Sequence, residues 1–317
     1  MLLAMSGFKN SGCKHDVLRM RPDVIPNAHK GAIHALAYNS TGRYVLSGGQ
    51  DKAVCLWNPA TKVRIQSYLK HSFEVLAIDV AADDSKFASV GGDRNVYVWD
   101  VGGGDTICSF DAHTLRINTA CFNSEGTVVA SGSNDTTVKL WDCRSRNYAP
   151  IQTLSDAKDS ITSVKIRGPQ ILTGSVDGRV RMYDIRTGKI TTDCVGSPVT
   201  CVNWSSDGNR FLVSSVDNYV RLFDATSGKL AQSFTGHASC QFRATSAFFD
   251  NETAVASTSE DGRLYLWDTS SGKVKNTLSS KTESETAHST AFALDTHPTQ
   301  PQLVASSFKG TIEVWKP

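Results

Sequence analysis

This sequence of 317 residues lacks the features that mark several large classes of protein. Its formal charge is only +2, from 33 basic and 31 acidic residues, which is too small for the overall field to attract nucleic acid or a membrane. No apolar run approaches the roughly 18 residues of a membrane span, and the opening MLLAM is too short for a signal-peptide core. We therefore expect a soluble intracellular protein, cytoplasmic and nuclear, that makes no membrane contact.

Paired cysteines and nucleotide-binding loops are also missing. The eight cysteines occur singly, with no C-x-x-C pair, so we expect reduced thiols and no structural zinc site. The glycine pairs form neither a complete P-loop nor a G-x-G-x-x-G followed by a helix. The sequence thus predicts no metal, no cofactor and no nucleotide fold. With 40% hydrophobic and 20% charged residues, it still has the composition of an ordinary globular protein.

What the sequence does contain is a repeat. Segments that end in an aromatic residue recur seven times, at spacings of 40 to 48 residues. This period fits the four-stranded blade of a β-propeller and leaves no residues for a second domain. We predict an all-β fold in which residues 1–317 form a single seven-bladed propeller domain, with residues 1–14 as a flexible tail. The seven aromatic residues are Trp57, Trp99, Trp141, Tyr183, Phe223, Trp267 and Trp315.

A second column shows where each blade turns. An aspartate stands six positions before the aromatic residue, between two β-prone runs, which predicts a tight hairpin. A histidine stands 28 positions before the aromatic residue in the first three repeats, with looser equivalents at His237 and His288. Lys309 replaces the aspartate in the seventh repeat. The aspartates are Asp51, Asp93, Asp135, Asp177, Asp217 and Asp261, and the histidines are His29, His71 and His113.

These columns resemble the WD-repeat family over essentially the whole chain. The resemblance implies that the histidine, a serine or threonine of the second strand, the turn aspartate and the tryptophan indole form a buried hydrogen-bonded chain. Such a chain keeps a buried carboxylate satisfied and orients the imidazole. Because later repeats lose the histidine or the tryptophan, we expect their blades to rely more on apolar packing. The complete sets are His29, Ser47, Asp51 and Trp57; His71, Ser89, Asp93 and Trp99; and His113, Ser131, Asp135 and Trp141.

Histidine, aspartate and serine also make up a hydrolase triad, which is the main catalytic alternative. A triad occurs once in an active site, whereas this set repeats at a fixed offset and is lost piecemeal in other repeats. The histidines fall in different blades, each with its own aspartate, and so make a poor metal cluster. We therefore expect structural roles for these residues, no catalytic residues and no enzyme activity.

The last repeat predicts how the ring closes. Trp315 belongs to the third strand of the seventh blade, and only two residues follow it, too few for a fourth strand. The segment before His29, which includes Val17 and Arg19, occupies the place that an outer strand holds before later repeats. An N-terminal strand should therefore complete the seventh blade and remove an exposed sheet edge.

Function should lie on the loops of one propeller face, which form a rim around the central channel. Arginine and aromatic residues dominate these loops, and that composition is typical of interface hot spots. RNA is an alternative ligand through phosphate contacts and base stacking, although so few basic groups would give only modest affinity. The predicted partner-binding residues are Phe73, Arg94, Arg116, Arg179, Tyr219, Phe242 and Arg243.

Longer strings narrow the resemblance. SVDGRVRMYDIRTGK and SEDGRLYLWD, together with WDCRSR, VGSPVTC and LVSSVD, are similar to a WD-repeat subfamily, the mitogen-activated protein kinase organizers. The resemblance implies a non-catalytic scaffold with two roles, one in a kinase cascade and one in the catalytic spliceosome during pre-mRNA splicing. Its partners would be splicing factors or kinase-cascade components, and the chain would be a monomer within larger assemblies.

A further possible function is that of a substrate receptor in a ubiquitin ligase. The segments that end in WDCR and YDIR resemble the box by which some propellers dock onto the adaptor of a cullin-RING ubiquitin ligase. Arg144 and Arg186 would be its key residues. Many WD repeats carry this pattern without that role, because an arginine after the WD pair can simply cap a strand end. Protein scaffold, ligase receptor and RNA-contacting propeller are thus the three functions to compare.

Overall fold

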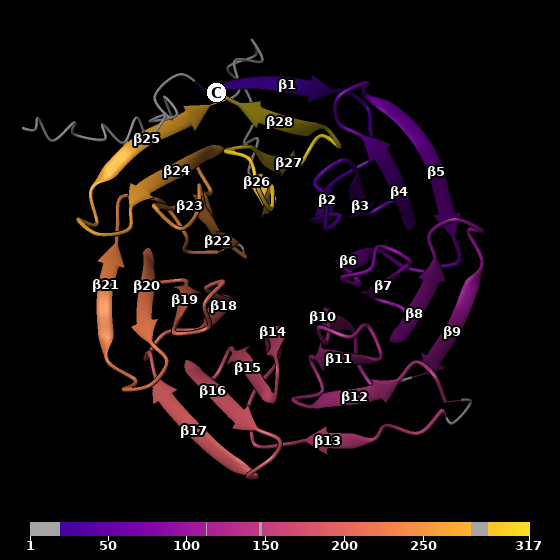
Figure 1. Cartoon of the computed structure of the whole chain (residues 1–317), viewed down its shortest axis with the longest axis horizontal. Helices are drawn as coiled ribbons and strands as arrows, with labels where there is room; N and C mark the ends of the chain where they lie inside the picture. The colour runs from indigo at the N-terminus through magenta and orange to yellow at the C-terminus, as the bar shows by residue number, and fades with distance from the viewer. Residues whose placement is uncertain (1–19, 112, 146–147, 242, 280–290) are drawn as a thin grey trace, which may run out of the picture.

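The computed structural model describes residues 20–111, 113–145, 148–241, 243–279 and 291–317. Every regular element within these ranges is a strand, and the strands form seven antiparallel sheets of four strands each. Figure 1 shows the sheets as blades around a central channel. The predicted all-β, seven-bladed propeller is confirmed. The ranges described contain no helix with the length and apolar character that crossing a membrane requires.

Blades are numbered 1 to 7 in chain order, and each places its strands in the same order from the channel outward (Figure 1). The innermost strands are β2 (Ile33–Tyr38), β6 (Val75–Val80), β10 (Ile117–Phe122), β14 (Ile161–Arg167), β18 (Val199–Trp204), β22 (Ser246–Phe249) and β26 (Ala291–Thr296). The second strands are β3 (Val45–Gly49), β7 (Lys86–Gly91), β11 (Val128–Ser133), β15 (Gln170–Ser175), β19 (Arg210–Ser215), β23 (Ala254–Thr258) and β27 (Leu303–Ser307).

The outer half of each blade carries the recurring aromatic residue and the free edge. The third strands are β4 (Ala53–Asn58), β8 (Asn95–Asp100), β12 (Val138–Asp142), β16 (Arg179–Asp184), β20 (Tyr219–Asp224), β24 (Arg263–Asp268) and β28 (Ile312–Lys316). The outermost strands are β5 (Val63–Leu69), β9 (Thr106–Asp111), β13 (Gln152–Leu154), β17 (Lys189–Cys194), β21 (Leu230–Phe234), β25 (Val274–Ser279) and, for blade 7, β1 (Arg21–Ile25).

The core lies between the blades rather than within any one of them. A second strand such as β3 is buried along its whole length because a blade packs against each of its faces. One cluster joins Leu56 and Tyr68 of blade 1 to Val75, Phe87 and Trp99 of blade 2. Each blade is thus stabilised by its neighbours, and the loops at the ends of the strands are held on a rigid ring.

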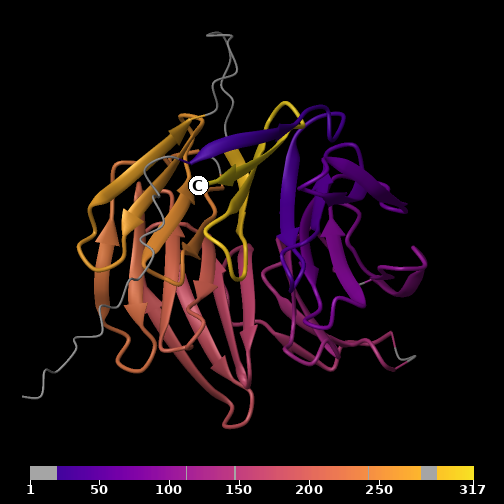
Figure 2. The ribbon, with the colours of Figure 1, turned by 45° about the horizontal axis from the view of Figure 1, so that its top comes forward.

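The N-terminal strand closes that ring as predicted. β1 pairs antiparallel with β28, from Arg21 opposite Lys316 to Ile25 opposite Ile312. Figure 2 shows the two strands side by side. Asp23 of β1 also forms ion pairs with Lys316 and with Lys62 of blade 1. The earlier part of the proposed strand, with Val17 and Arg19, lies outside the described residues, as does the proposed tail over 1–14.

A bulge near the start of the inner strand recurs in blades 1 to 5. In each, the pairing with the second strand skips one residue immediately after the first pair. A bulge leaves its extra residue unpaired and re-aims the side chain. The five residues skipped in this way are His34, Leu76, Asn118, Thr162 and Thr200.

Candidate functional site

The motif residues of blades 1 to 3 form the same hydrogen-bonded chain. In blade 3, Trp141 Nε1 donates to Ser131 Oγ at 2.9 Å, and Ser131 Oγ lies 2.8 Å from His113 Nε2. His113 Nδ1 lies 2.8 Å from the Asp135 carboxylate. Blades 1 and 2 repeat these contacts at 2.7 to 2.8 Å. The three histidine side chains are fully buried, so the chain joins strands rather than facing a substrate.

Asp135 holds its hairpin together through several donors. Its carboxylate also accepts hydrogen bonds from the backbone N–H groups of Thr114 and Thr137 and from the Thr137 hydroxyl. Burial raises the pKa of Asp135, but the bonds from Thr137 and His113 outweigh burial and hold that pKa below its ordinary value. Burial lowers the pKa of His113, so its ring is neutral near pH 7. A neutral ring suits a chain in which Nδ1 donates and Nε2 accepts.

Blades 4 and 5 replace the missing histidine with an arginine. Arg181 Nη2 lies 2.6 Å from the Asp177 carboxylate, and Arg221 Nη2 lies 2.6 Å from that of Asp217. The Arg181 side chain is only 3% exposed, so its charge needs this partner. In both blades an ion pair thus satisfies the turn aspartate, which the expectation of greater apolar packing did not foresee.

Blade 6 keeps the buried histidine without the hydrogen-bonded chain. His237 packs edge-on against the ring of Trp267, with 5.4 Å between ring centroids, and neither of its nitrogens has a hydrogen-bond partner among the described residues. Asp261 instead accepts a bond from the Tyr265 hydroxyl at 2.9 Å, and Trp267 Nε1 donates to the Thr235 carbonyl. In blade 7, His288 lies outside the described residues.

His237 makes stability sensitive to acid. Burial lowers its pKa from 6.5 to about 4, although Asp261, Asp217 and Glu260 act in the opposite direction. The folded state therefore disfavours protonation, and its stabilisation is present above pH 6.5 and is lost as the pH falls toward 4. As the pH falls from 7 to 4.5, the parent should therefore lose about 2–3 kcal/mol of stability that the His237→Phe variant does not lose. Urea unfolding of parent and variant at pH 7, 5.5 and 4.5 measures it, and parallel pH curves would contradict the prediction.

The predicted partner-binding residues do not share one environment. Phe73 is 60% exposed and Tyr219 is 40% exposed. Arg94, Arg116 and Arg179 are also exposed. Arg243 is turned inward, and its Nη1 donates to the backbone carbonyl of Asn118 at 3.0 Å. Phe242 lies outside the described residues.

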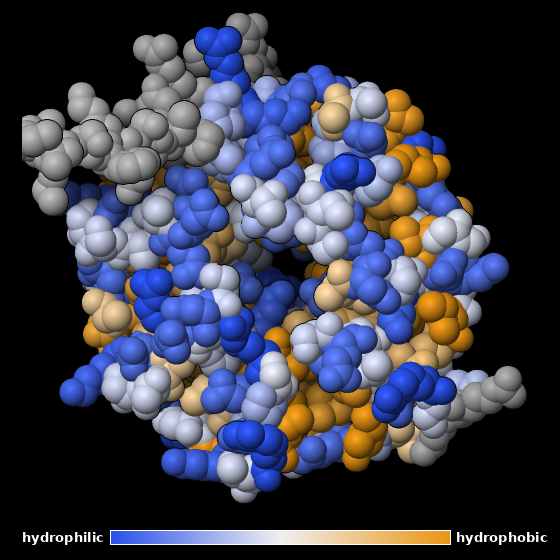
Figure 3. All heavy atoms as spheres, in the orientation of Figure 1, coloured by the Kyte–Doolittle hydropathy of each residue, from blue (hydrophilic) through white to orange (hydrophobic). Residues whose placement is uncertain are grey.

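A contiguous patch on the rim spans blades 1 to 3. Lys52 Nζ lies 5.9 Å from the centre of the Phe73 ring, and Arg94 Nη1 reaches the Thr114 carbonyl at 3.5 Å. Leu115, which follows Thr114, is 51% exposed. These contacts place Phe73, Arg94 and Leu115 on neighbouring loops of the same face, and we call these three residues the rim patch. Apolar residues also gather at the outer edge of the propeller, over β5 and β9 (Figure 3).

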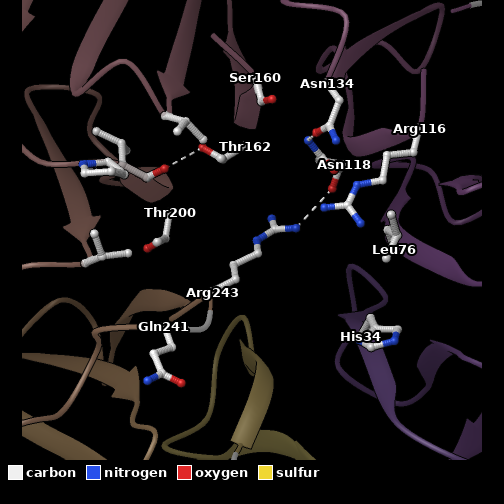
Figure 4. Close-up of a pocket in the computed structure, with 14 residues that line it drawn as sticks. His34, Leu76, Arg116, Asn118, Asn134, Ser160, Thr162, Thr200, Gln241 and Arg243 are labelled. Carbon is white, nitrogen blue, oxygen red and sulfur yellow. Dashed lines mark hydrogen bonds between the residues drawn. The ribbon is translucent and has the colours of Figure 1, made fainter. Parts of the chain in front are cut away.

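The channel opens on this face into a cavity of about 400 Å³. The five bulge residues line it, together with Arg116, Asn134, Ser160, Gln241 and Arg243 among others. Figure 4 shows the side chains of Arg116 and Arg243 pointing toward each other across it. The sequence pattern indicated the two arginines but not the bulge residues, because nothing local to each strand shows that five of them meet. The arginines of blades 4 and 5 could have been found, since each stands four positions after its aspartate.

The structure also shows the surroundings of possible metal ligands, of the cysteines and of the arginines that follow the WDC and YDI segments. Across the described ranges, no three histidine, cysteine or acidic side chains converge as metal ligands do, and the seven cysteines within them are free thiols. Arg144 Nε lies 3.1 Å from the Asp142 carboxylate, and the Arg186 backbone N–H is bonded to Asp184. Both contacts lie at strand ends, as expected for residues that cap a strand.

Seven blades, the first three of which carry the complete chain of histidine, serine, aspartate and tryptophan, define a WD-repeat β-propeller. The profile of the first β-propeller of IFT122 matches residues 32–316. WD repeat domain-containing protein 83 of Rattus norvegicus is 46% identical over 90% of this chain and 89% of its own length. That of Xenopus tropicalis is 50% identical over 91% and 90%, and an uncharacterized WD repeat-containing protein of Schizosaccharomyces pombe is 45% identical over 90% and 95%. The chain therefore belongs to the WD-repeat family.

Proposed function

We propose that this chain is a non-catalytic scaffold that binds splicing factors during pre-mRNA splicing and also organises a mitogen-activated protein kinase cascade. Its fold suits such a role, because a closed ring of blades holds loops at fixed positions. The similarity to the kinase-organizer subfamily supports the choice of partners. A chain with both roles would be monomeric within larger assemblies and would occur in the nucleus and the cytoplasm.

The observation that carries this proposal is the rim patch. Aromatic residues and arginine are enriched at protein interfaces relative to the rest of the protein surface. Phe73 and Leu115 are both more than half exposed, and Arg94 lies between them in chain order. Since the loops are rooted in rigid sheets, little ordering cost accompanies binding. RNA binding is less well supported, because Arg94 is the one basic residue of the rim patch and Lys52, beside Phe73, adds a single further charge for phosphate contacts.

The test is a double substitution, Phe73→Ala with Arg94→Glu. Both residues are exposed, so the melting temperature should change little. Recovery of splicing factors or cascade kinases from cell extract should fall sharply, because truncating hot-spot residues typically costs about 2–4 kcal/mol, or thirty-fold to several hundred-fold in affinity.

The matched control is Ile65→Ala with Arg64→Glu on β5, which makes the same changes on the exposed outer edge. It should recover the same partners as the parent chain. If the control loses them and the rim variant retains them, the binding surface is the outer edge and the rim assignment is wrong. If the parent recovers RNA in place of proteins, and nuclease treatment abolishes every protein contact, the scaffold proposal fails.

A further inference from the structure

The cavity at the channel mouth has an unusual balance of charge. Figure 4 draws the fourteen residues that line it. Two of them, Arg116 and Arg243, are arginines and none is acidic. Burial lowers the pKa of His34, which also lines the cavity; Glu74 acts in the opposite direction, and the positive charges of Arg243 and Arg116 add to the lowering. The positive charges of both guanidinium groups are therefore felt inside the same cavity.

Neither arginine forms an ion pair with a carboxylate of the described residues, whereas Arg181 and Arg221 of the neighbouring blades each do. Glu74, an acidic residue on the rim, lies with its carboxylate 3.8 Å from His34 Nε2. Two like charges on facing side chains repel each other, and the burial of the Arg243 guanidinium adds to that cost. An anion between them would relieve both.

The aspartates deeper in the channel do not neutralise these arginines. Asp79 accepts the Phe122 backbone N–H at 2.8 Å and lies 3.9 Å from Lys165 Nζ. Asp295 accepts the Tyr38 backbone N–H at 2.7 Å. Both carboxylates thus bridge their own blade to the next one or pair with Lys165, and the excess positive charge at the mouth remains.

Several neutral polar side chains around the cavity already form hydrogen bonds within the propeller. The Asn118 side-chain amide donates to Asn134 Oδ1 and to the Ile161 carbonyl. The hydroxyls of Thr162 and Thr200 donate to backbone carbonyls of the following blade. By contrast, Arg243 uses only Nη1, on the Asn118 carbonyl, and its buried Nε has no hydrogen-bond partner among the described residues. Arg116 and Arg243 therefore supply the charged donors of the cavity, beside neutral side chains such as Gln241 and Ser160.

From this geometry we propose that the channel mouth binds an oxyanion carried on a peptide, either a carboxylate side chain or a phosphorylated residue, held between Arg116 and Arg243. The site rests on the proposed function, since the peptide belongs to a partner protein. A guanidinium presents its N–H groups as a planar fork, which matches the two oxygens of a carboxylate or two oxygens of a phosphate. A cavity of about 400 Å³ has room for one acidic side chain and part of its backbone.

The experiment measures fluorescence anisotropy of fluorescein-labelled nonapeptides on the full chain. Three pools share random uncharged flanks and carry glutamate, phosphoserine or glutamine at the central position. The parent chain should bind one or both acidic pools at least about tenfold more tightly than the glutamine pool, because hydrogen bonds to charged groups are the strong ones. The pool that binds more tightly identifies the source of the oxyanion.

The decisive variant is Arg243→Gln, which should abolish the preference for acidic peptides. Arg64→Gln, on the outer edge, is the matched control and should keep it. If the glutamine variant is poorly folded, Arg243→Lys retains the charge without the fork, and it should lower the preference without abolishing it. Equal binding of the three pools by the parent, or loss of the preference in Arg64→Gln, would overturn the site.

Partner recovery separates this inference from the proposed function. If Arg243→Gln recovers splicing factors or kinases as well as the parent does, the channel site is not their contact and the inference fails while the scaffold role stands. If the parent itself recovers none of them, the proposed function fails, and the peptide preference still decides whether the channel mouth is an anion site.

Discussion

Removal of residues 1–25 should unfold the propeller or bring it close to unfolding. The deletion takes away all of β1 and leaves β28 as an open edge at the place where the ring closes. The deletion also removes a ladder of hydrogen bonds, each worth about 0.5–1.5 kcal/mol net. It removes the buried side chains of Met20 and Ile25 as well, which are worth about 1.5–3 kcal/mol each. Together these losses exceed about 5 kcal/mol, which is comparable to the whole stability of many domains.

Two companion variants make this result interpretable. A chain that lacks residues 1–19 keeps β1 and controls for truncation as such, so its urea midpoint should lie well above that of the chain without residues 1–25. Ile25→Ala keeps the strand but opens a cavity beside Ile312 and Val314, and it should lower the free energy of unfolding by about 2–4 kcal/mol. A chain without residues 1–25 that melts with the parent would show that β1 does not hold the ring closed.

Asp135→Ala should destabilise the hairpin of blade 3 and lower the stability of the whole propeller. The alanine removes the acceptor for His113, for two backbone N–H groups and for the Thr137 hydroxyl at once. Donors left buried without an acceptor cost about 1–3 kcal/mol each, though part of this is recovered by relaxation. We expect the free energy of unfolding to fall by about 2–4 kcal/mol.

The matched control for this substitution is Asp142→Ala. Asp142 stands at a strand end in the same blade and bonds the exposed Arg144, so its loss should change the urea midpoint little. Partner recovery by folded Asp135→Ala should equal that of the parent, because the side chain faces the hairpin and not the rim. A stable Asp135→Ala variant that had lost a chemical activity would contradict the structural role of this residue.

Much of the architecture was predictable because it is encoded locally. The seven aromatic residues, the aspartate six positions earlier and the alternating runs between them indicate hairpins and strands without any knowledge of distant residues. The count of blades follows from the count of repeats. The need for an N-terminal strand follows from a seventh repeat that stops after its third strand, and the pairing of β1 with β28 confirms it.

The partners of individual polar residues were harder to predict. Arg181 and Arg221 stand on the same side of their strands as the turn aspartate, and each takes the place of an absent histidine. His237 matches the histidine column only loosely in sequence, and its ring contacts aromatic residues without joining a hydrogen-bonded chain. Whether a side chain reaches its partner depends on distances of about an ångström, which spacing along the chain does not specify.

The sequence by itself determined the class, the number of blades, the hairpins and the strand that closes the ring, because strand period and turn chemistry act over a few residues. Only the tertiary structure decided what gathers at the channel mouth. Arg243 meets the carbonyl of Asn118 across 125 positions of sequence, and bulges in five separate blades turn their extra residues toward the same cavity. Closure of the ring, not any local pattern, brings these groups together, because the residues that line the cavity come from six different blades.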